Sequence, residues 1–459
     1  MAENETSLPA ALPTVTAATV IKVHEWLAKG DVASVNKLAE DLLPVDLAGL
    51  LELSNHDDRQ VLIGFLKPYL TPEVISCLDV EVRDEILERL APREIAAAVA
   101  ELDSDDAVDL VEDLDDEQRA AVIANLPAEE RQLVEQALTW PEESAGRLMQ
   151  REVIAVPEDW TVGKTLDHLQ SQAEELPPVF HDIVVVDPWR KVVGTLHLYQ
   201  LMRAGRATKI RDIMDEDVRH IPVTMDREEI AFLFKRYRLH SAPVVDEEDK
   251  LLGVITFDDM VEVMEEEAEE DILKLGGVTA EESLHDDVME VTKSRFAWLF
   301  VNLITAFLAA AAIGMFEQSI QQVVALAVLM PIVASMGGNA GTQTLTVAVR
   351  ALSTRELGPS NYWQLILREI RIGVVNGIGF AAIVGLVAWV WFRDAGIGLV
   401  IALAMVINLV AAGFSGALIP IVLRRVGVDP AVASAVFLTT VTDIVGFVAF
   451  LGLATLVLL

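Results

Sequence analysis

The chain has 459 residues, 52% of them hydrophobic, and carries 71 acidic against 35 basic side chains. The net charge of −36 argues against a nucleic acid partner, whose phosphates it would repel, and favours cations or a basic partner. A single cysteine, Cys77, excludes an intramolecular disulfide and fits a reducing compartment.

The charge is divided unevenly along the chain. Residues 296–459 contain 7 basic and 6 acidic side chains, which leaves 28 basic and 65 acidic ones in residues 1–295. The sequence therefore predicts an acidic soluble part followed by a membrane part. The N-terminus, MAENETSLPAALPTV, lacks the basic and apolar regions of a signal peptide, so we expect the acidic part to stay in the cytosol.

The first elements are short helices. We expect residues 1–34 to form a partly disordered N-terminal segment. Residues 35–145 combine apolar positions at helical spacing with Pro and Asp every 12–18 residues, which predicts an all-α repeat domain in which each hairpin buries its face on the next. Asp105, Asp106 and Asp109 form an acidic cluster in this domain, and such clusters are usually solvated surface.

Residues 146–257 contain an internal repeat. VVVDPWRKVVGTLHLYQLM, from Val184, aligns at an offset of 59 residues with PVVDEEDKLLGVITFDDMV, from Pro243. Each copy has the pattern of a strand, a polar turn, a second strand and a helix. The pair resembles a tandem of CBS domains, an α+β regulatory module that often binds adenine nucleotides.

In the CBS family, a Thr and an Asp after the second strand contact the nucleotide. The resemblance therefore implies Thr256 and Asp259 as candidate ligands of a nucleotide such as ATP. The first copy has His197 and Gln200 instead, so the sequence supports at most one ordinary nucleotide pocket. The alternative is that the repeat is only a scaffold.

A strongly acidic segment, residues 258–292, connects the repeat to the membrane part. Its sequence DDMVEVMEEEAEEDILKLGG predicts one long helix over 258–275, ended by two glycines. The helix holds 9 carboxylates against one basic residue, Lys274. Like charges at helical spacing oppose folding unless something neutralises them. A divalent cation would do so, which suggests a cation-dependent switch.

Residues 293–459 form the membrane part, where five stretches are long enough to cross a bilayer: 296–316, 321–349, 372–392, 396–423 and 430–459. Eight basic residues lie in the loops on the side of the acidic domain and only Arg393 lies on the other side. This asymmetry places the acidic domain in the cytosol and the C-terminus outside.

The second stretch contains LMPIVASMGGNAGTQTLTVAVRAL. Pro331, Gly337, Gly338, Asn339 and Gly341 predict a break in the helix at mid-membrane, whose freed carbonyls would suit a hard cation or its hydration water. The alternative is close helix packing through small residues.

Asp443 is the only acidic residue well inside a predicted span, since others such as Glu369 fall at span ends or in loops. An acidic side chain at a helix centre costs roughly 2.5–3.5 kcal/mol on insertion scales. Two copies of Asp443 near a dimer axis would hold a hydrated divalent cation, which suits Mg²⁺ because it dehydrates reluctantly. A protonated Asp bonded to a neighbouring helix, or a proton relay, are the alternatives.

The order of these parts resembles the MgtE family of magnesium channels. The motifs that carry the resemblance are GGNAGTQ, EAEEDILKLGG, RRVGVDPA and TTVTDIVG. It implies a homodimer in the inner membrane with a pore at the dimer interface, and two pore residues, Asp443 and the carbonyl of Thr439. To these we add Gly337, Gly338 and Asn339 from the predicted break in the second stretch.

The resemblance further implies cytosolic Mg²⁺ sensor residues, which are Asp429, Asp226, Glu228, Asp259, Glu262, Glu267, Glu270 and Asp271, to which we add the cluster of Asp105, Asp106 and Asp109. Mg²⁺ bridging these carboxylates would close the pore. Arg238 departs from the family, because we expect another sensor carboxylate there, so the set of bound cations is smaller or the threshold is shifted.

The predicted fold class is a multidomain membrane protein with a helical-repeat domain, a CBS pair, a connecting helix and five transmembrane helices. The predicted function is a Mg²⁺ channel closed by cytosolic Mg²⁺. The alternatives are a carrier of Mg²⁺, Co²⁺ or Mn²⁺ that works by alternating access, and a nucleotide-regulated receptor without a path. The sequence contains no P-loop and no recognisable catalytic site.

Overall fold

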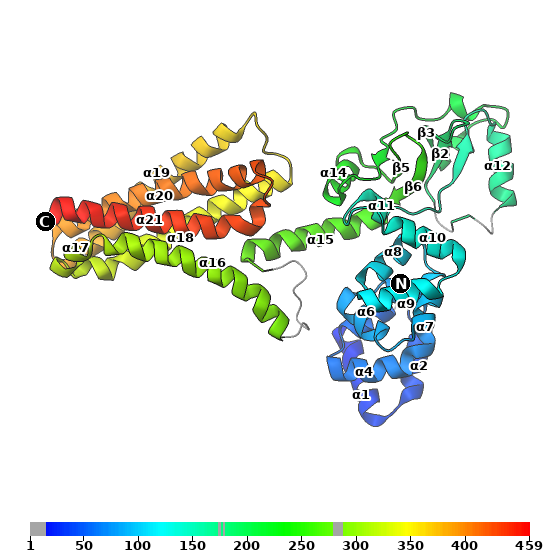
Figure 1. Cartoon of the computed structure of the whole chain (residues 1–459), viewed down its shortest axis with the longest axis horizontal. Helices are drawn as coiled ribbons and strands as arrows, with labels where there is room; N and C mark the ends of the chain where they lie inside the picture. The colour runs from blue at the N-terminus through cyan, green and yellow to red at the C-terminus, as the bar shows by residue number, and fades with distance from the viewer. Residues whose placement is uncertain (1–14, 173–175, 178–179, 279–287) are drawn as a thin grey trace, which may run out of the picture. The chain divides into compact units, whose positions relative to one another are not determined.

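The computed structural model describes residues 15–172, 176–177, 180–278 and 288–459. The chain divides into two compact units, Met1–Met264 and Glu265–Leu459 (Figure 1). Residues 1–14, within the segment expected to be partly disordered, and residues 279–287 of the connecting segment lie outside the described residues.

Unit 1 begins with a stack of short helices, as the repeat pattern predicts. Prolines open α3, α5 and α7, while Asn55 and Asp115 cap α4 and α9, which explains the regular punctuation of the sequence. The helices are α1 (Ala17–Lys29), α2 (Val32–Asp41), α3 (Pro44–Glu52), α4 (His56–Leu66), α5 (Pro72–Ser76), α6 (Val80–Leu87), α7 (Pro92–Val99), α8 (Ser104–Asp113), α9 (Asp116–Asn125) and α10 (Ala128–Ala137), with a short 3₁₀ turn at Lys67–Tyr69.

The helical layer starts before the boundary that we expect at residue 35. That position lies inside α2, and Val23 of α1 is buried in the same apolar cluster as Leu50 and Leu62. The amphipathic face of α1 therefore belongs to the helical domain, because it has no other surface on which to bury.

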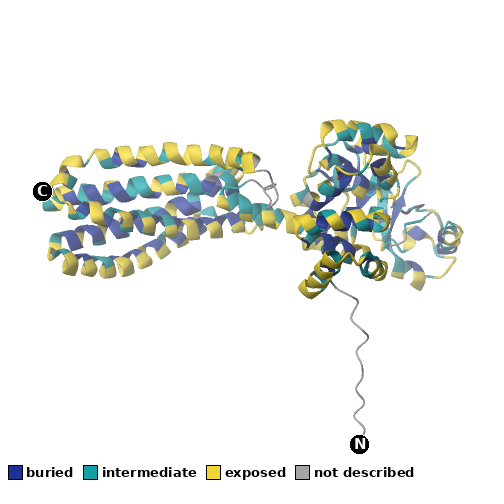
Figure 2. Ribbon diagram, turned by 90° about the horizontal axis from the view of Figure 1, so that it is seen from below, coloured by how far each residue is buried: buried dark blue, intermediate teal, exposed yellow. Residues whose placement is uncertain are grey.

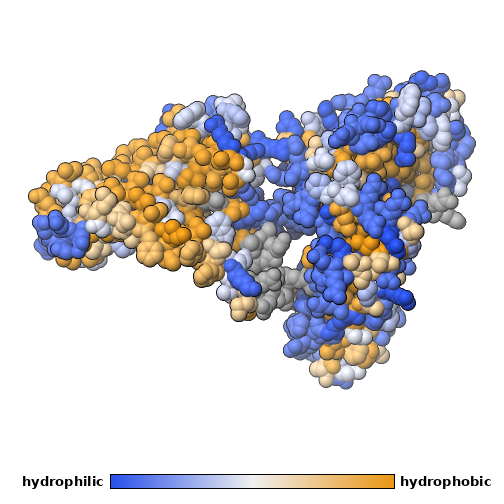
Figure 3. Space-filling view, in the orientation of Figure 1, coloured by the Kyte–Doolittle hydropathy of each residue, from blue (hydrophilic) through white to orange (hydrophobic). Residues whose placement is uncertain are grey.

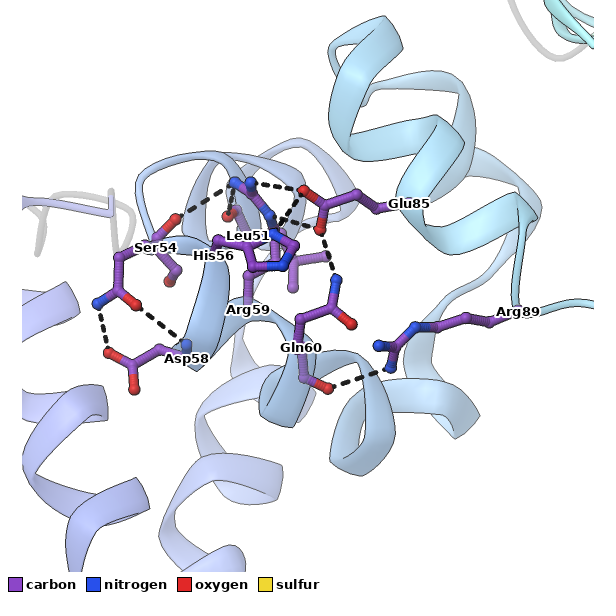
Figure 4. Close-up of polar contacts among 9 residues, drawn as sticks. Leu51, Ser54, His56, Asp58, Arg59, Gln60, Glu85 and Arg89 are labelled. Atoms are coloured by element: carbon purple, nitrogen blue, oxygen red, sulfur yellow. Dashed lines mark hydrogen bonds and ion pairs between the residues drawn. The ribbon is translucent and has the colours of Figure 1, made fainter. Parts of the chain in front are cut away.

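Arginine side chains join successive helices of this layer. Arg59 is fully buried; its guanidinium donates to the carbonyls of Leu51 and Ser54 at the end of α3 and pairs with Glu85 at 2.8 Å (Figure 4). Arg119 caps the end of α8 in the same way. A buried charge is tolerated here because it has an ion-pair partner or several carbonyl acceptors.

The rest of unit 1 is the predicted tandem repeat. It comprises α11 (Ala145–Leu148), β1 (Ala155–Pro157), α12 (Val162–Ser171), β2 (Asp182–Val186), β3 (Val192–His197), α13 (Leu198–Arg203), a 3₁₀ turn (Ile210–Asp212), β4 (Ile221–Pro222), α14 (Arg227–Tyr237), β5 (Ser241–Val245) and β6 (Leu251–Thr256). Each copy forms a sheet with a parallel and an antiparallel pair, in the orders β1-β2-β3 and β4-β5-β6. Both sheets have a register shift at the same place, so the second copy repeats the first in detail.

Helix α15 (Phe257–Gly276) follows directly, as the sequence predicts, and ends where Gly277 adopts a left-handed conformation. Its first turns belong to unit 1, because Met260 and Val263 are buried in the core of the second repeat copy. Its last turns belong to unit 2.

The described residues of unit 2 contain five helices that are long and apolar enough to cross a membrane, in agreement with the predicted number. They are α16 (Val288–Gly314), α18 (Ala325–Ser353), α19 (Tyr362–Phe392), α20 (Ala395–Arg425) and α21 (Pro430–Leu458), with a short α17 (Glu317–Gln322) between the first two. The visible surface of unit 2 is largely apolar (Figure 3). Helix α16 packs on α21 and leaves most of its residues exposed (Figure 2).

The predicted break in the second span is wrong, because α18 is one continuous helix through the glycines. The glycines instead allow close packing. Asn408 of α20 lies against Gly337, where a Cβ would be 2.2 Å from its amide nitrogen, and Leu438 of α21 lies against Gly341. Packing against neighbouring helices therefore outweighs the low helix propensity of these residues.

Two adjacent glycines provide a matched test of this packing. Gly337→Ala places a methyl group on Asn408 and should lower the free energy of unfolding by about 1–3 kcal/mol. A Cβ at residue 338 has no neighbour within 4 Å, so Gly338→Ala should leave the free energy of unfolding unchanged or raise it. Thermal unfolding of the two full-length variants in detergent measures the difference. Equal losses in both would contradict the packing role.

Candidate cation path and sensor sites

Asp443 and Thr439 lie one turn apart on α21. Thr439 is exposed and Asp443 is half-buried, so the two side chains share a face that the single chain does not cover. The Thr439 hydroxyl donates to the Ala435 carbonyl at 2.9 Å, and the Thr439 carbonyl accepts the Thr442 hydroxyl at 3.0 Å. The carbonyl that is expected to bind the cation therefore already accepts a side-chain hydroxyl within the helix.

Asn339 of α18 lies at the same depth as Asp443. Gly341 contacts Leu438, and one turn earlier Gly337 contacts Asn408, which also lies against Gly446 of α21. These two contacts show that α18 and α21 run antiparallel, and they place Asn339 and Asp443 between the same two packing layers. The structure therefore brings two of the expected pore residues to one level.

A polar stripe runs along the exposed face of α18. Its residues follow helical spacing, and every one is exposed: Ser335, Asn339, Thr342, Gln343 and Thr346. The hydroxyls of Thr342 and Thr346 donate to carbonyls one turn back, and the Asn339 amide donates to Ser335 at 3.3 Å. A polar face is costly against lipid, so this stripe indicates contact with water or with another protein surface.

Gly337 and Gly338 are not cation ligands by way of a broken backbone. Gly337 is buried against Asn408, and the Gly338 carbonyl accepts the Thr342 hydroxyl at 2.9 Å within an unbroken helix. The contribution of Gly337 is the close approach of Asn408 of α20, whereas a Cβ at residue 338 would meet no neighbour within 4 Å.

Sequence reasoning missed two polar residues of the membrane unit. Asn408 is fully buried and donates to the Val333 carbonyl at 2.8 Å, which fastens α20 to α18. Glu369 lies inside α19, is 5% exposed, and accepts the Thr344 hydroxyl at 3.1 Å. The signal for Asn408 was its isolation in an apolar span, whereas Glu369 was assigned to a span end because α19 starts ten residues before the predicted span.

A cavity of about 510 Å³ opens beside Thr439, between the end of α15 and two membrane helices. Arg295 and Asn302 of α16 and Ala435 of α21 contribute to its walls, together with Gly277. The end of the connecting helix therefore lies next to the face that carries Thr439 and Asp443.

In unit 1, the structure brings part of the sensor set together. Burial first, then the charges of Asp259 and Asp106, raise the pKa of Asp105 from 3.8 to about 8. Burial, followed by acidic neighbours that include Asp259 and Glu262, raises the pKa of Asp106 to about 6. Helix α8 thus faces the first turns of α15 with carboxylates on both sides, an arrangement that a divalent cation would stabilise.

Asp109 differs from its two neighbours. Its carboxylate accepts from Arg83 at 2.7 Å, and the same guanidinium also pairs with Asp113, so a fixed cation already compensates this charge. Two further sensor residues, Asp226 and Glu228, lie at the start of α14, where Asp226 accepts the Glu228 amide as a helix cap. Arg238 ends the same helix in a left-handed conformation.

In unit 2, three of the remaining predicted sensor residues lie along one half-buried face of α15. Glu267, Glu270, Asp271 and Lys274 follow helical spacing on that face. Lys274 pairs with Glu270 and, at 3.1 Å, with Asp429, which caps α21. The structure therefore brings Glu270, Asp271 and Asp429 together at the junction of α15 and α21.

The two residues that are candidates for binding a nucleotide form hydrogen bonds with each other. Thr256 donates to Asp259 through its hydroxyl at 2.6 Å and its amide at 3.2 Å. In the first copy, the backbone amide of His197 donates the equivalent hydrogen bond to the side chain of Gln200. A nucleotide at Thr256 and Asp259 would have to replace the bond between them.

Within the described residues, no three His, Cys, Asp or Glu side chains converge as a compact metal cage. Mg²⁺ does not require one, since it keeps several waters and binds through one or two carboxylates.

Comparison with known proteins assigns the chain to a family. A model described as a divalent cation transporter matches residues 330–453, the MgtE intracellular N domain matches 42–143, and the CBS domain matches 145–207 and 210–266. A magnesium transporter MgtE of Thermus thermophilus is 32% identical over 444 residues, which cover 95% of this chain and 98% of the relative. The chain belongs to the MgtE family of magnesium transporters.

A second curated relative agrees. The magnesium transporter MgtE of Bacillus subtilis is 29% identical over 436 residues, which cover 95% of this chain and 96% of the relative. A crystal structure of the cytosolic domain of the Mg²⁺ channel MgtE in complex with ATP is 31% identical, covers 53% of this chain and 99% of its own, and has a TM-score of 0.48. The resemblance to the MgtE family, with its N domain and CBS pair, is confirmed.

The raised pKa of Asp105 predicts a pH dependence. Between its ordinary pKa of 3.8 and about 8, the folded protein binds a proton that the unfolded chain has lost, so its stability falls as pH rises through this window. When the pH rises from 5.5 to 8.5 without divalent cations, the free energy of unfolding should fall by about 1–3 kcal/mol more in wild type than in Asp105→Asn.

Thermal unfolding of the full-length protein at the two pH values, with a chelator present, measures this difference. Adding Mg²⁺ at pH 8.5 should then stabilise wild type more than the variant. If both proteins show the same pH dependence, Asp105 is not the buried acid that the structure indicates.

Proposed function

We propose that this MgtE family member is a Mg²⁺-selective channel in the cell's inner membrane, formed by two copies of the chain and closed by cytosolic Mg²⁺. Unit 1 and the basic loops of unit 2 lie in the cytosol, and the C-terminus lies outside. Mg²⁺ enters the cell down its electrochemical gradient.

One observation carries the proposal: the membrane unit has a polar face that its own helices leave uncovered. This face comprises the polar stripe of α18, defined by Ser335, Asn339, Thr342, Gln343 and Thr346, together with Thr439 and Asp443 of α21. Lipid cannot solvate such a face cheaply, whereas a second copy and a water-filled path between the copies can. A symmetric dimer presents the same face twice about its axis.

The chemistry of this face fits Mg²⁺ as substrate. Mg²⁺ keeps much of its hydration shell, so a selective site needs carboxylates and polar groups that accept hydrogen bonds from its waters. Two half-buried Asp443 carboxylates would provide charge, while the Asn339 amides at the same depth and the exposed Thr439 hydroxyls would bond the waters.

The acidic clusters fit closure by the same ion. Asp105 and Asp106 face Asp259 and Glu262 within unit 1, and Glu270, Asp271 and Asp429 meet within unit 2. Carboxylates outnumber basic groups at these contacts, although Lys274 pairs with Glu270 and Asp429, so the excess negative charge favours a divalent cation. Mg²⁺ that accumulates in the cytosol would therefore stabilise both contacts of α15, and with them the closed channel.

ATP at the second CBS copy is a secondary proposal. Its support is that Thr256 ends β6 and Asp259 follows it, close to the position that the CBS pattern gives the nucleotide ligands. Calorimetric titration of ATP into wild type and Asp259→Asn tests it, and equal heats would exclude this site.

Single-channel recording tests the function. Purified protein in planar bilayers, with Mg²⁺ as the only permeant cation, should give discrete currents that disappear when millimolar Mg²⁺ is added on the cytosolic side. Saturable flux without discrete currents would favour a carrier of Mg²⁺, Co²⁺ or Mn²⁺. No flux at all would favour a receptor.

Asp443→Asn tests the selectivity site. The variant should reduce the Mg²⁺ current by about tenfold or more, because the neutral amide no longer attracts the hydrated cation. Asp394→Asn is the control, because Asp394 caps α20 and Asn caps equally well. Currents measured on both variants at equal protein amounts decide the role, and an unchanged current in Asp443→Asn would contradict it.

A further inference from the structure

Lys274 ties the end of α15 to the start of α21. Its ammonium lies 3.1 Å from Oδ2 of Asp429 and also contacts Oε1 of Glu270, one turn earlier on its own helix. It is the one basic residue of α15. This contact lies wholly within unit 2.

The neighbouring residues of α15 dock on the same part of the membrane unit. Leu275 packs against the apolar cluster of Leu345 and Val349 of α18 and Ala431 of α21. Asp271 accepts a hydrogen bond from Ser353, the last residue of α18. The ion pair of Lys274 is therefore one component of a larger docking contact.

Both oxygens of Asp429 are engaged. Oδ1 accepts the backbone amide of Ala431 at 2.8 Å, which caps α21, and Oδ2 accepts the ammonium of Lys274. The capping amide is fixed in the helix, whereas the lysine stem is flexible. Each oxygen keeps a second lone pair, but a divalent cation at Asp429 and the ammonium on Oδ2 repel each other. A metal ion that binds Asp429 directly therefore competes with Lys274.

Lys274 stays charged in this position. Its ammonium pairs with the carboxylates of both Glu270 and Asp429. Glu270, Asp271 and Asp429 provide three carboxylates against this one ammonium. The excess of negative charge attracts a divalent cation, while the lysine opposes its binding.

We infer that Lys274 is a tethered competitor of the regulatory cation. Without bound Mg²⁺, its ammonium holds α15 against α21 through Asp429. When Mg²⁺ binds Asp429, the ammonium leaves that oxygen, so the lysine raises the Mg²⁺ concentration that the site needs. The inference rests on the proposed function, since it names what sets the threshold of the same sensor.

Binding of Mn²⁺, a paramagnetic substitute for Mg²⁺, tests the competition directly. Mn²⁺ is titrated into the full-length protein in detergent, and its binding is followed by electron paramagnetic resonance. The site in question is the one that is lost in the Asp429→Asn variant. Lys274→Met keeps the apolar stem and should tighten binding at that site by about three- to tenfold. Lys274→Arg keeps the charge and should restore affinity close to that of wild type.

The matched control is Lys250→Met, which removes an exposed lysine that pairs with Glu248 in unit 1 and should leave this site unchanged. Unchanged or weaker Mn²⁺ binding in Lys274→Met would overturn the inference. So would equal tightening in Lys250→Met, since the effect would then come from net charge alone.

Current measurements separate this inference from the proposed function. In planar bilayers, Lys274→Met should close at about three- to tenfold lower cytosolic Mg²⁺ than wild type. If Mg²⁺ does not close wild type, the proposed gating fails, and Mn²⁺ binding still decides the competition. If wild type closes and Lys274→Met closes at the same concentration, the gating stands and the role of Lys274 is refuted.

Discussion

The cost of polar groups in a membrane is the constraint on which the arrangement depends. An acidic side chain at a helix centre costs roughly 2.5–3.5 kcal/mol on insertion scales, and the polar stripe of α18 adds to this cost. The single chain leaves that stripe exposed and covers Asp443 only in part. Tight packing elsewhere, at Gly337 and Gly341, holds α18 and α21 so that their polar residues lie at one depth. In the function that we propose, a cation path between two copies offsets this cost, and the same polar groups select the cation.

Helix α15 has a related electrostatic cost, the repulsion between like charges. Its carboxylates repel one another, and both of its ends meet further carboxylates, on α8 in unit 1 and at Asp429 in unit 2. Some of this charge is compensated from within the chain, since Arg83 pairs with Asp109 and Lys274 pairs with Asp429. The acidic residues are therefore not equivalent sensors. Those without a fixed cation, such as Asp105 and Asp106, have the most to gain from Mg²⁺.

The sequence was sufficient for the fold wherever a local pattern determines structure. The offset of 59 residues between copies predicted paired strands that occur at that spacing, and Gly277 was read correctly as the end of α15. The apolar lengths predicted five membrane helices. In these elements, periodicity, capping and turn residues all indicate the same structure.

The sequence did not predict those features that depend on contacts between residues far apart in the chain. The break predicted in α18 does not occur, because Asn408, far along the chain, packs against Gly337 and supports the helix. Glu369 was placed outside its span because a hydropathy window rejects charge, whereas Thr344 satisfies it inside the bundle. The partners of Arg83 and Lys274 were invisible for the same reason. Family resemblance supplied the sensor residues but not which of them are already paired.

Cysteine cross-linking between copies tests the central claim that two chains meet at the face of Asp443. Cys77 is the single cysteine, so a Cys77→Ser background allows one thiol to be placed at a time. Thr439→Cys should form a disulfide-linked dimer on mild oxidation in native membranes. Leu386→Cys, on an exposed position of α19, should remain monomeric. A monomer in both, or equal dimers in both, would contradict a path shared by two copies at this face.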